Sequence, residues 1–533
     1  MEERSVGKVW LVGAGPGDAG LFTRKGYDVL QQADVVVYDA LVGDGVLGLV
    51  PRDARTIDVG KRAANHTMRQ EQISQVLLDE ALAGNRVVRL KGGDPFLFGR
   101  GGEELELLAA HDVPFEVVPG ITSAIAVPAY NGIPVTHRDF TSSLHIITGH
   151  KREGADYDID FEALVRTKGT LVFLMGVRSL PDIMQGLLSA GMDPATPAAV
   201  LQEGTTAGQR RVVATVETLA EKADEARIAA PAIIVVGGVA SLADQFEWYE
   251  KLPLMGCKVV VTRPAELVST MSDRLRVLGA EVLDLPSIAT VPLAVDGADG
   301  ALAEGESAGE IGEVVGPKVM LAEALGKLAS YDWLVFTSPS GVRIFFDQLL
   351  EAGTDIRSLA GAKIAALGAG TAKELRARGF VADFVPTVAN GEALGRELAK
   401  EAAVPSRILI PRARIGNKQL VEALVAAGHE VDDVPTYETV PVTQGLVDVA
   451  GKFEAGKIFC VAFTSSSGVR AFAKANPGLD LGAIQAACIG EQTRATAAEL
   501  GMQTWMAETA TMDSLCDLIV NQFAGRAGER AGE

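Results

Sequence analysis

Residues 89–104 read RLKGGDPFLFGRGGEE, and this stretch decides the fold predicted for the first half of the chain. It continues a short apolar run, so we expect a strand that ends in a glycine-rich loop. Gly92 and Gly93 allow a ligand to approach the backbone closely, and Pro95 restricts the direction of the exit. Glu103 and Glu104 suit the first turn of a following helix. So dense a run of Gly, Asp and Arg favours a binding loop over a plain connection.

The same alternation extends over the whole chain. Short Val- and Ile-rich runs end in Gly, Ser, Thr or Asp, and longer amphipathic stretches separate them. Examples are KVWLVGAG (8–15), ADVVVYD (33–39), TLVFLMG (170–176), VVVTRP (259–264) and RILIPRA (407–413). This pattern predicts an α/β protein with parallel sheets, whose ligands bind beyond the carboxyl ends of the strands.

Length and composition limit the remaining classes. A chain of 533 residues suggests three to four compact units. Only four cysteines are present, which excludes a disulfide scaffold and favours a reducing, cytoplasmic location. No apolar run approaches the length of about 18 residues that a membrane helix needs, and the N-terminus lacks the apolar core of a signal peptide. The net charge of −20 and 5% aromatic residues argue against nucleic acid as a partner.

The first glycine cluster, VGAGPGD (12–18), departs from the dinucleotide fingerprint because Asp18 occupies the position of the last glycine. A pyrophosphate would meet this carboxylate, so the alternative of a dinucleotide-dependent enzyme is disfavoured. The sequence contains no GK[ST] phosphate loop. The six histidines show no ligand spacing, and we expect no metal.

The second half begins near residue 257 and contains a repeat. FTSPSGV (336–342) matches FTSSSGV (463–469), and a G-x-x-T motif follows each copy at 368–371 and 490–493. VVVTRPAE (259–266) and ILIPRARI (408–415) form a looser pair. Two similar lobes explain this repeat. An acidic, Gly-rich segment at 291–313 reads as a solvated, mobile insertion. Its G-x-S-x-G around Ser307 lacks the strand that a nucleophile elbow requires, so we do not expect it to be catalytic.

The motifs of the first half occur in an order that resembles the tetrapyrrole methylase family, and especially its uroporphyrinogen-III C-methyltransferases. They include VGAGPGD (12–18), VVVYDALV (35–42), VGKR (59–62), LKGGDPFLFGRGGEE (90–104), VVPGITSA (117–124), GIPVTHR (132–138) and PAIIVVGGVA (231–240). The resemblance implies a domain over 1–250 with two α/β lobes, at about 8–134 and 135–245. It also implies S-adenosylmethionine (SAM) as the methyl donor and a homodimer formed through this half.

The same resemblance implies site residues. Asp39 and Lys61 would transfer protons, and Arg62 would bind substrate. A carboxylate suits proton removal from a methylated pyrrole, and a cation suits substrate carboxylates. The donor site would comprise Pro16, Gly92, Gly93, Asp94, Leu97, Thr122, Ser123, Met175, Gly204 and Ala232.

The second half is similar to uroporphyrinogen-III synthases. VVVTRP, FTSPSGV, PTYET (435–439), FTSSSGV and CIGEQT (488–493) follow the order of that family. The resemblance implies a domain over 257–533 with two similar parallel-sheet lobes joined by two strands. Lobe 1 would span about 257–288 plus 440–533, and lobe 2 about 289–439.

The substrate implied for this half is hydroxymethylbilane, a linear tetrapyrrole with eight carboxylates. Tyr437 and Thr493 would be catalytic. The residues that would bind substrate are Arg263, Ser338, Arg412, Ser465 and Ser466.

Together the two resemblances indicate a bifunctional enzyme. It would cyclise hydroxymethylbilane to uroporphyrinogen III with inversion of the last ring. It would then methylate this product at C2 and C7 to give precorrin-2, for sirohaem, cobalamin or haem d1. The alternative left open is a methylase fused to a non-catalytic binding or scaffold module.

Overall fold

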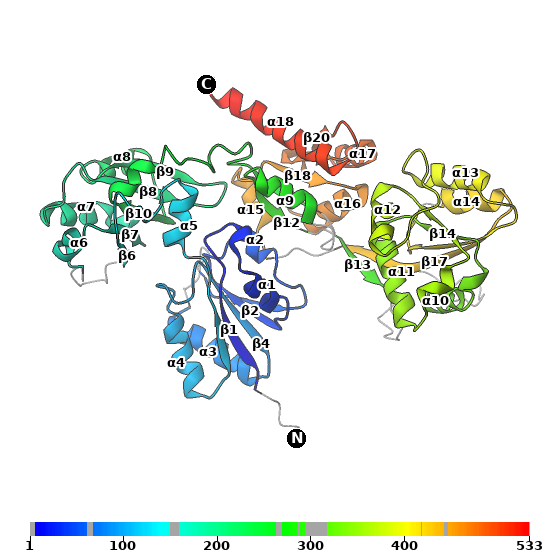
Figure 1. The fold of residues 1–533 in the computed structure, drawn as a ribbon, viewed down its shortest axis with the longest axis horizontal. Coiled ribbons are helices and arrows are strands. Elements are labelled where there is room, and N and C mark those ends of the chain that lie inside the picture. The colour runs from blue at the N-terminus through cyan, green and yellow to red at the C-terminus, as the bar shows by residue number, and fades with distance from the viewer. Residues whose placement is uncertain are drawn as a thin grey trace. The chain divides into compact units, whose positions relative to one another are not determined.

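The computed structural model describes residues 6–60, 68–149, 159–262, 269–285, 288–293, 317–416, 418–441 and 446–531. Figure 1 shows four α/β lobes, each built around a five-stranded sheet. The predicted α/β fold class is confirmed. The chain forms two compact units, residues 1–287 with 443–533 and residues 288–442, and each is described by itself below.

The first sheet has the order β3-β2-β4-β1-β5, and all of its strands are parallel. Its strands are β1 (Lys8–Gly13), β2 (Val35–Tyr38), β3 (Arg55–Asp58), β4 (Arg86–Lys91) and β5 (Phe115–Val118). The helices are α1 (Arg24–Leu30), α2 (Asp44–Leu47), α3 (Gln70–Leu82), α4 (Gly101–Ala110) and α5 (Ser123–Tyr130).

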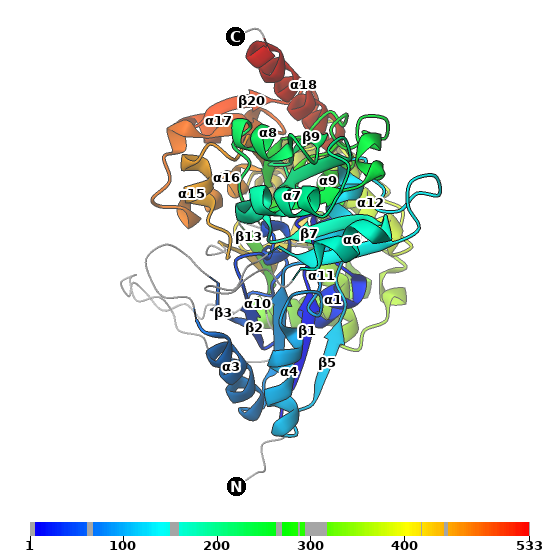
Figure 2. The same ribbon diagram turned by 90° about the vertical axis from the view of Figure 1, so that its left-hand side faces the viewer.

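Alternating residues of β1 serve two cores, because successive side chains of a strand point to opposite faces. Val9 and Leu11 belong to one core with the residues of α3 and α4, and these two helices lie side by side in Figure 1 and Figure 2. Val12 belongs to the core on the other face, with Leu30 of α1 and Val46 of α2. The sheet is therefore covered on both faces, as its continuous apolar strands predict.

The second sheet corrects the expectation of parallel strands. Its order is β6-β7-β10-β8-β9, and only β6 and β7 are parallel. Burial on both faces produces apolar runs whatever the strand direction, so the sequence pattern could not distinguish the two arrangements. The strands are β6 (Leu144–Thr148), β7 (Thr170–Leu174), β8 (Pro197–Gln202), β9 (Arg210–Thr215) and β10 (Ala232–Val236). The helices are α6 (Phe161–Thr167), α7 (Leu180–Ser189) and α8 (Leu219–Glu225).

The third sheet is fully parallel, in the order β12-β11-β18-β19-β20. From β11 the sheet extends to one side with β12 and to the other side with β18, β19 and β20. The position between β11 and β18 is therefore the switch point, where such sheets bind ligands. The strands are β11 (Lys258–Val261), β12 (Glu281–Asp284), β18 (Cys460–Phe463), β19 (Gln485–Cys488) and β20 (Gln503–Met506). The helices are α9 (Ser269–Val277), α15 (Val449–Glu454), α16 (Ser466–Ala475), α17 (Glu491–Glu499) and α18 (Met512–Ala531).

The fourth sheet makes up the second unit and has the order β13-β17-β16-β14-β15. It is parallel except at its edge, where β13 runs antiparallel to β17. The strands are β13 (Ile288–Pro292), β14 (Trp333–Phe336), β15 (Lys363–Ala366), β16 (Arg407–Ala413) and β17 (Glu430–Pro441). The helices are α10 (Pro317–Gly326), α11 (Pro339–Glu351), α12 (Ala369–Ala377), α13 (Gly391–Glu401) and α14 (Gln419–Ala426).

The sequence repeat corresponds to equivalent positions in the third and fourth sheets. A Cβ added to Gly341 would lie 3.2 Å from Ser338 Oγ and 3.5 Å from the carbonyl oxygen of Pro411. A Cβ added to Gly468 would lie 3.3 Å from Ser465 Oγ and 3.5 Å from the carbonyl oxygen of Thr262. The FTS motifs therefore sit against β16 in one lobe and β11 in the other. The fold-level repeat is confirmed, and the looser pair of motifs belongs to it.

Part of the acidic segment at 291–313 can be assessed. Val291 and Pro292 end strand β13 and are not part of an insertion. Residues 294–313, with Ser307, lie outside the described residues. Within the described ranges, no helix is long and apolar enough to cross a membrane. Among the same described residues, no three His, Cys, Asp or Glu side chains are placed to hold a metal ion.

Candidate functional site

Three glycine backbones meet at the carboxyl ends of β1, β4 and β5. A Cβ added to Gly13 would lie 2.5 Å from Gly120 Cα and 2.6 Å from the carbonyl oxygen of Gly93. Gly15 and Gly93 exchange backbone hydrogen bonds of 2.7 and 3.2 Å. Gly93 also has a φ of +67°, which favours glycine. The cluster therefore leaves backbone, and not side chains, facing any ligand at this edge.

Asp94 holds the binding loop together. Its Oδ1 accepts hydrogen bonds from the backbone N–H groups of Phe96 and Leu97, at 2.8 and 3.2 Å. Its Oδ2 accepts from the N–H of Gly120 at 3.0 Å. The carboxylate is thus used to join the loop after β4 to the loop after β5.

The second lobe contributes the remaining donor-site candidates. Leu97, from the loop after β4 in the first lobe, packs against a hydrophobic core that includes Val127 of α5 and Leu201 of β8. Gly204 approaches Val127 so closely that a Cβ would clash with its side chain. Met175 follows β7 with a φ of +56° and is 55% exposed, so it is not a core residue. The structure therefore places Leu97, Gly204 and Met175 at the contact between the two lobes or at the ends of strands.

The other candidates fit the same arrangement. Thr122 caps α5 by accepting a hydrogen bond from Ala124 N at 3.2 Å. Ser123 N would lie 3.9 Å from a Cβ at Gly93. Pro16 lies in the loop after β1, beside Gly17, and Ala232 begins β10.

Asp39 lies at the end of β2 beside a buried network of charges. Arg89 Nη2 lies 3.1 Å from Asp39 Oδ2, and Leu41 N donates to Asp39 Oδ1 at 3.1 Å. Arg89 Nε and Lys91 Nζ both contact Glu104 Oε1, at 3.3 and 2.7 Å. Burial, followed by the charge of Arg89, lowers the pKa of Lys91 despite the attraction of Glu104.

This network was missed in the sequence. Arg89, Lys91 and Glu104 are at most 4% exposed, whereas Glu103 lies on the surface with Arg100. The sequence pattern assigned both glutamates to a helix N-terminus. The available signal was the pair of basic residues inside an apolar strand, because buried cations require a buried partner.

Three of the predicted residues cannot be placed. Lys61, Arg62 and Arg263 lie outside the described residues.

In the second unit, Ser338 and Tyr437 meet at the carboxyl edge of the fourth sheet. Their hydroxyl oxygens lie 2.7 Å apart, and Ser338 Oγ also accepts from Gly341 N at 2.9 Å as the cap of α11. Tyr437 is 5% exposed, and burial raises the pKa of its phenol. It is therefore a neutral hydroxyl that can donate a hydrogen bond but does not readily ionise.

Arg412, in the same unit, is not a free cation facing solvent. Its Nε and Nη2 contact the two carboxylate oxygens of Asp433 at 2.6 and 2.5 Å. The guanidinium is buried, and a Cβ added to Gly416 would lie 2.6 Å from Nη1. Its neighbour Pro411 lies close to Gly341, which also adjoins Ser338 and Tyr437, and the charge of Arg412 is balanced within the lobe.

The first unit carries the second group of synthase candidates, at the ends of β18 and β19. Ser465 caps α16 by accepting from Gly468 N at 3.1 Å, and Ser466 Oγ donates to Gln492 O at 3.0 Å. Thr493 is buried in α17, as is its repeat counterpart Thr371 in α12. Because both threonines are buried at equivalent positions, their burial follows from the repeated architecture of the two lobes.

The chain therefore has two parts, one with a glycine-lined strand edge and one with hydroxyl side chains at the strand ends of each of its lobes. Residues 8–220 match the family Tetrapyrrole (Corrin/Porphyrin) Methylases. Residues 269–517 match Uroporphyrinogen-III synthase HemD. The chain belongs to the fusions of a tetrapyrrole methylase with a HemD-type uroporphyrinogen-III synthase. It has uroporphyrinogen-III C-methyltransferase and uroporphyrinogen-III synthase activities.

The relatives cover the chain to different extents. "Porphyrin biosynthesis protein HemD" of Ruminiclostridium josui is 43% identical over 97% of this chain and 99% of that protein. "Uroporphyrinogen-III C-methyltransferase" of Bacillus subtilis is 40% identical, over 70% of this chain and 72% of that protein. "Siroheme synthase" of Ectopseudomonas mendocina is 50% identical over 46% of this chain and 53% of that protein. The chain thus spans about half the length of this last relative.

Solved structures match the two halves separately. Uroporphyrin-III C-methyl transferase of Thermus thermophilus, complexed with S-adenyl homocysteine, is 42% identical with a TM-score of 0.39. The match covers 44% of this chain and 99% of that chain. A mutant uroporphyrinogen III synthase of Thermus thermophilus is 19% identical with a TM-score of 0.35, over 51% of this chain and 99% of that chain.

We expect Glu104→Gln to destabilise the first lobe by about 3 kcal/mol, because two buried cations lose their buried counter-charge. Hydrogen exchange in peptides from β4 and α4 measures this effect. The control is Glu103→Gln, whose exposed pair with Arg100 should contribute little. Equal exchange in the two variants would contradict the assigned importance of the network.

Proposed function

We propose that the first half transfers two methyl groups from SAM to C2 and C7 of uroporphyrinogen III, giving precorrin-2. The observation that carries this proposal is the glycine-lined edge around Gly13, Gly93 and Gly120, where added Cβ atoms would not fit. Such an edge suits a donor held by backbone N–H and C=O groups. Pro16, Ser123 and Ala232 complete the proposed donor site. SAM, when bound, supplies an electrophilic methyl group on sulfur.

The residues of the chain act on the other reactant. A substituted pyrrole carbon attacks the methyl group, the carbon–sulfur bond breaks and S-adenosylhomocysteine leaves. The methylated carbon is then quaternary, so the proton must be lost from a pyrrole N–H or from a conjugated carbon. Asp39 is proposed as the base that accepts this proton, because it is a partly exposed carboxylate at the same sheet edge. Arg89 orients it from the buried side. Lys61 and Arg62 are proposed to assist proton transfer and to bind substrate carboxylates.

The Asp39→Asn variant should lose about 10²-fold or more in the rate of methyl transfer at saturating SAM, because the amide cannot accept the proton. Its affinity for S-adenosylhomocysteine should remain that of the wild type. Stopped assays with uroporphyrinogen III and titration calorimetry measure the two quantities. Asp28→Asn, on the exposed face of α1, is the control. A wild-type rate in Asp39→Asn removes this residue from the mechanism.

We propose that the second half closes hydroxymethylbilane into uroporphyrinogen III with inversion of the last ring. Loss of the substrate hydroxyl is assisted by a hydrogen-bond donor at the departing oxygen, and ring closure needs a folded substrate. Tyr437 is proposed as this hydrogen-bond donor, since its phenol stays neutral and lies within hydrogen-bond distance of Ser338. In the other lobe, Thr493 is proposed as a catalytic residue, and Ser465 and Ser466 are proposed to bind substrate. Arg263 is proposed to bind substrate carboxylates. Arg412, whose charge is balanced by Asp433, is proposed to hold the strand edge that carries Tyr437.

We expect Tyr437→Phe to lower the synthase rate at least tenfold without a matching loss of stability, because only the hydroxyl is removed. Tyr331→Phe is a matched control in the same unit. It also removes a largely buried hydroxyl, one that donates to Asp432. Uroporphyrinogen III formed from hydroxymethylbilane is quantified by chromatography. Equal rates in the two variants would exclude a catalytic function for the Tyr437 hydroxyl.

The joint function is tested on the full chain with hydroxymethylbilane and SAM in one reaction. We expect a product two methyl groups heavier than uroporphyrinogen III, identified by mass spectrometry. Accumulation of only the uninverted isomer would favour the alternative in which the second half is a non-catalytic module. Uroporphyrinogen III without added methyl groups would instead contradict the proposed methylase reaction.

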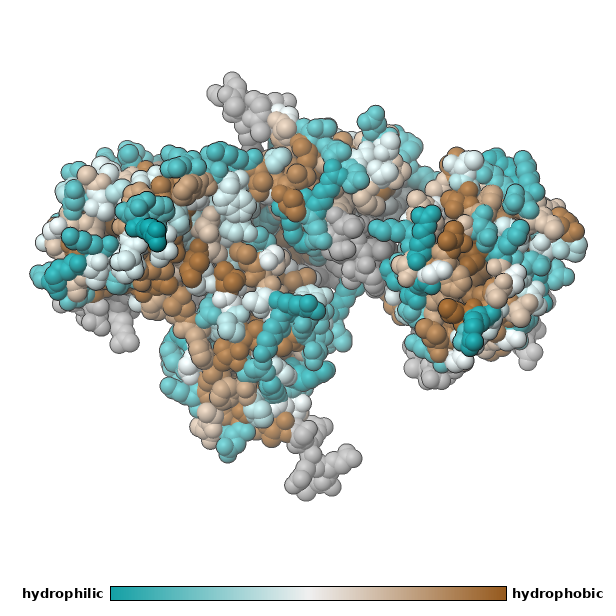
Figure 3. Space-filling view, viewed as in Figure 1, coloured by the Kyte–Doolittle hydropathy of each residue, from teal (hydrophilic) through white to brown (hydrophobic). Residues whose placement is uncertain are grey.

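We also propose a homodimer through the methylase half and a cytoplasmic location. Exposed apolar side chains of this half support the first proposal, and Phe96, Phe98 and Ile125 are each more than 40% exposed. Figure 3 shows hydrophobic residues on the surface of the first lobe. The second proposal is supported by the four cysteines, which are all buried free thiols. A reducing compartment keeps thiols in this state.

A further inference from the structure

The first unit includes a direct contact between the methylase half and the first synthase lobe. Helix α2 packs against β12, and one hydrophobic core contains Val46 and Leu47 from the former and Leu283 from the latter. The same core extends to Val260 and Phe463 of the synthase lobe. Apolar contact of this kind keeps water away from the polar groups at its margin, so charges there interact strongly.

Four charged side chains lie at this margin. Lys258 Nζ lies 2.7 Å from Glu281 Oε1 and 3.5 Å from Asp44 Oδ2, and Lys452 Nζ lies 2.6 Å from the same Asp44 oxygen. All four side chains are between 11 and 22% exposed. Burial alone would lower the pKa of Lys258, but Glu281 and Asp44 raise it, so this lysine remains a cation. The position of the Glu281 carboxylate is thereby set by Lys258.

The second oxygen of Glu281 reaches the methylase half. Glu281 Oε2 accepts a hydrogen bond of 2.9 Å from the backbone N–H of Ala207. Ala207 belongs to the turn between β8 and β9 that also carries Gly204. In this turn, Glu203 and Thr205 have φ angles of +45° and +71°, which residues other than glycine rarely adopt. Such conformations persist only where surrounding contacts hold them.

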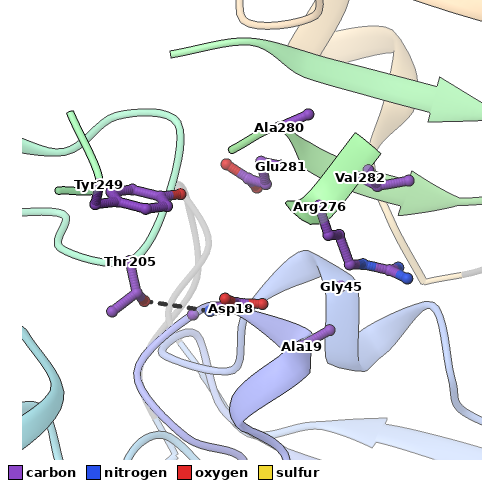
Figure 4. Close-up of a pocket in the computed structure, with 10 residues that line it drawn as sticks. Asp18, Ala19, Gly45, Thr205, Tyr249, Arg276, Ala280, Glu281 and Val282 are labelled. Carbon is purple, nitrogen blue, oxygen red and sulfur yellow. Dashed lines mark hydrogen bonds between the residues drawn. The ribbon is translucent and has the colours of Figure 1, made fainter. Parts of the chain in front are cut away.

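The turn is connected in its other direction to the glycine loop after β1. Asp18 N donates to Thr205 Oγ1 at 3.2 Å, and a Cβ added to Gly17 would lie 2.7 Å from Thr206 Cγ2. Figure 4 shows Asp18, Thr205 and Glu281 around one small pocket. A continuous series of contacts therefore leads from Lys258 through Glu281 to two segments of the donor site.

We propose that Glu281, a residue of the synthase half, is a positioning residue for the methyl-donor site, because its carboxylate anchors the turn that carries Gly204. The inference rests on the proposed donor site. In this proposal Glu281 acts through Ala207 and Thr205 and does not itself bind donor or substrate. The synthase lobe would thus form part of the framework that holds the methylase loops in their binding conformation.

This proposal is tested by measuring the binding of S-adenosylhomocysteine to the full chain with titration calorimetry. We expect Glu281→Ala to weaken binding about tenfold, because the partly buried N–H of Ala207 loses its acceptor and the turn loses its anchor. The KM for SAM should rise similarly while kcat changes little. Glu281→Gln should restore most of the affinity, since its amide oxygen can still accept from Ala207 N. Glu499→Ala, on the exposed end of α17 in the same lobe, is the matched control and should bind as the wild type.

The outcomes distinguish failure of the Glu281 proposal from failure of the proposed donor site. Wild-type affinity in Glu281→Ala would overturn the inference while leaving the donor site intact. Absence of binding in the wild type would overturn the proposed donor site itself. The synthase rate of each variant reports whether the lobe is folded. If Glu281→Ala loses that rate, Glu281→Asp takes its place, because it keeps the charge near Lys258 but shortens the reach to Ala207. Wild-type affinity in Glu281→Asp would then overturn the inference.

Discussion

The close approach of the Gly13, Gly93 and Gly120 backbones is the constraint on which the proposed methyl-donor site depends. No side chain fits between these segments, so the carboxyl ends of β1, β4 and β5 present main-chain groups to a ligand. Asp94 then joins two of the loops through three backbone N–H groups. The Gly204 turn of the second lobe meets the glycine loop through Thr205, which extends the same arrangement to the other wall of the site.

Charges in this protein are placed locally against an acidic background of net charge −20. Arg89 and Lys91 are buried beside Glu104, and Arg89 also contacts Asp39. In the second unit, Arg412 is paired with Asp433. Buried cations of this kind cannot attract a polycarboxylate from solution as free charges would. Their physical effect is to fix the geometry of neighbouring groups. In the first half this group is the Asp39 carboxylate, and in the second it is the strand edge near Tyr437.

The sequence predicted a large part of the fold because strand ends and glycine loops are local signals. The FTS repeat correctly indicated two lobes of equivalent architecture, and the parallel strands of the first and third sheets were predicted. The antiparallel strands β8, β9 and β10 were not, because apolar runs report burial on both faces and not strand direction. Glu104 was correctly assigned to the first turn of a helix. Its buried charge partners were missed, because they come from the neighbouring strand β4. Arg412 was expected to face a ligand, and its pairing with Asp433 depends on the register of β16 against β17.

By itself, the sequence determined the α/β class, the two halves, the glycine-rich loops and the chemical types of the candidate residues. These features follow from local composition and from motifs within single connections. Only the tertiary structure decided which charges are buried together, which hydroxyls meet and how the synthase lobe contacts the Gly204 turn through Glu281. Those contacts join residues far apart in the chain, and their energies depend on burial, which local sequence does not specify.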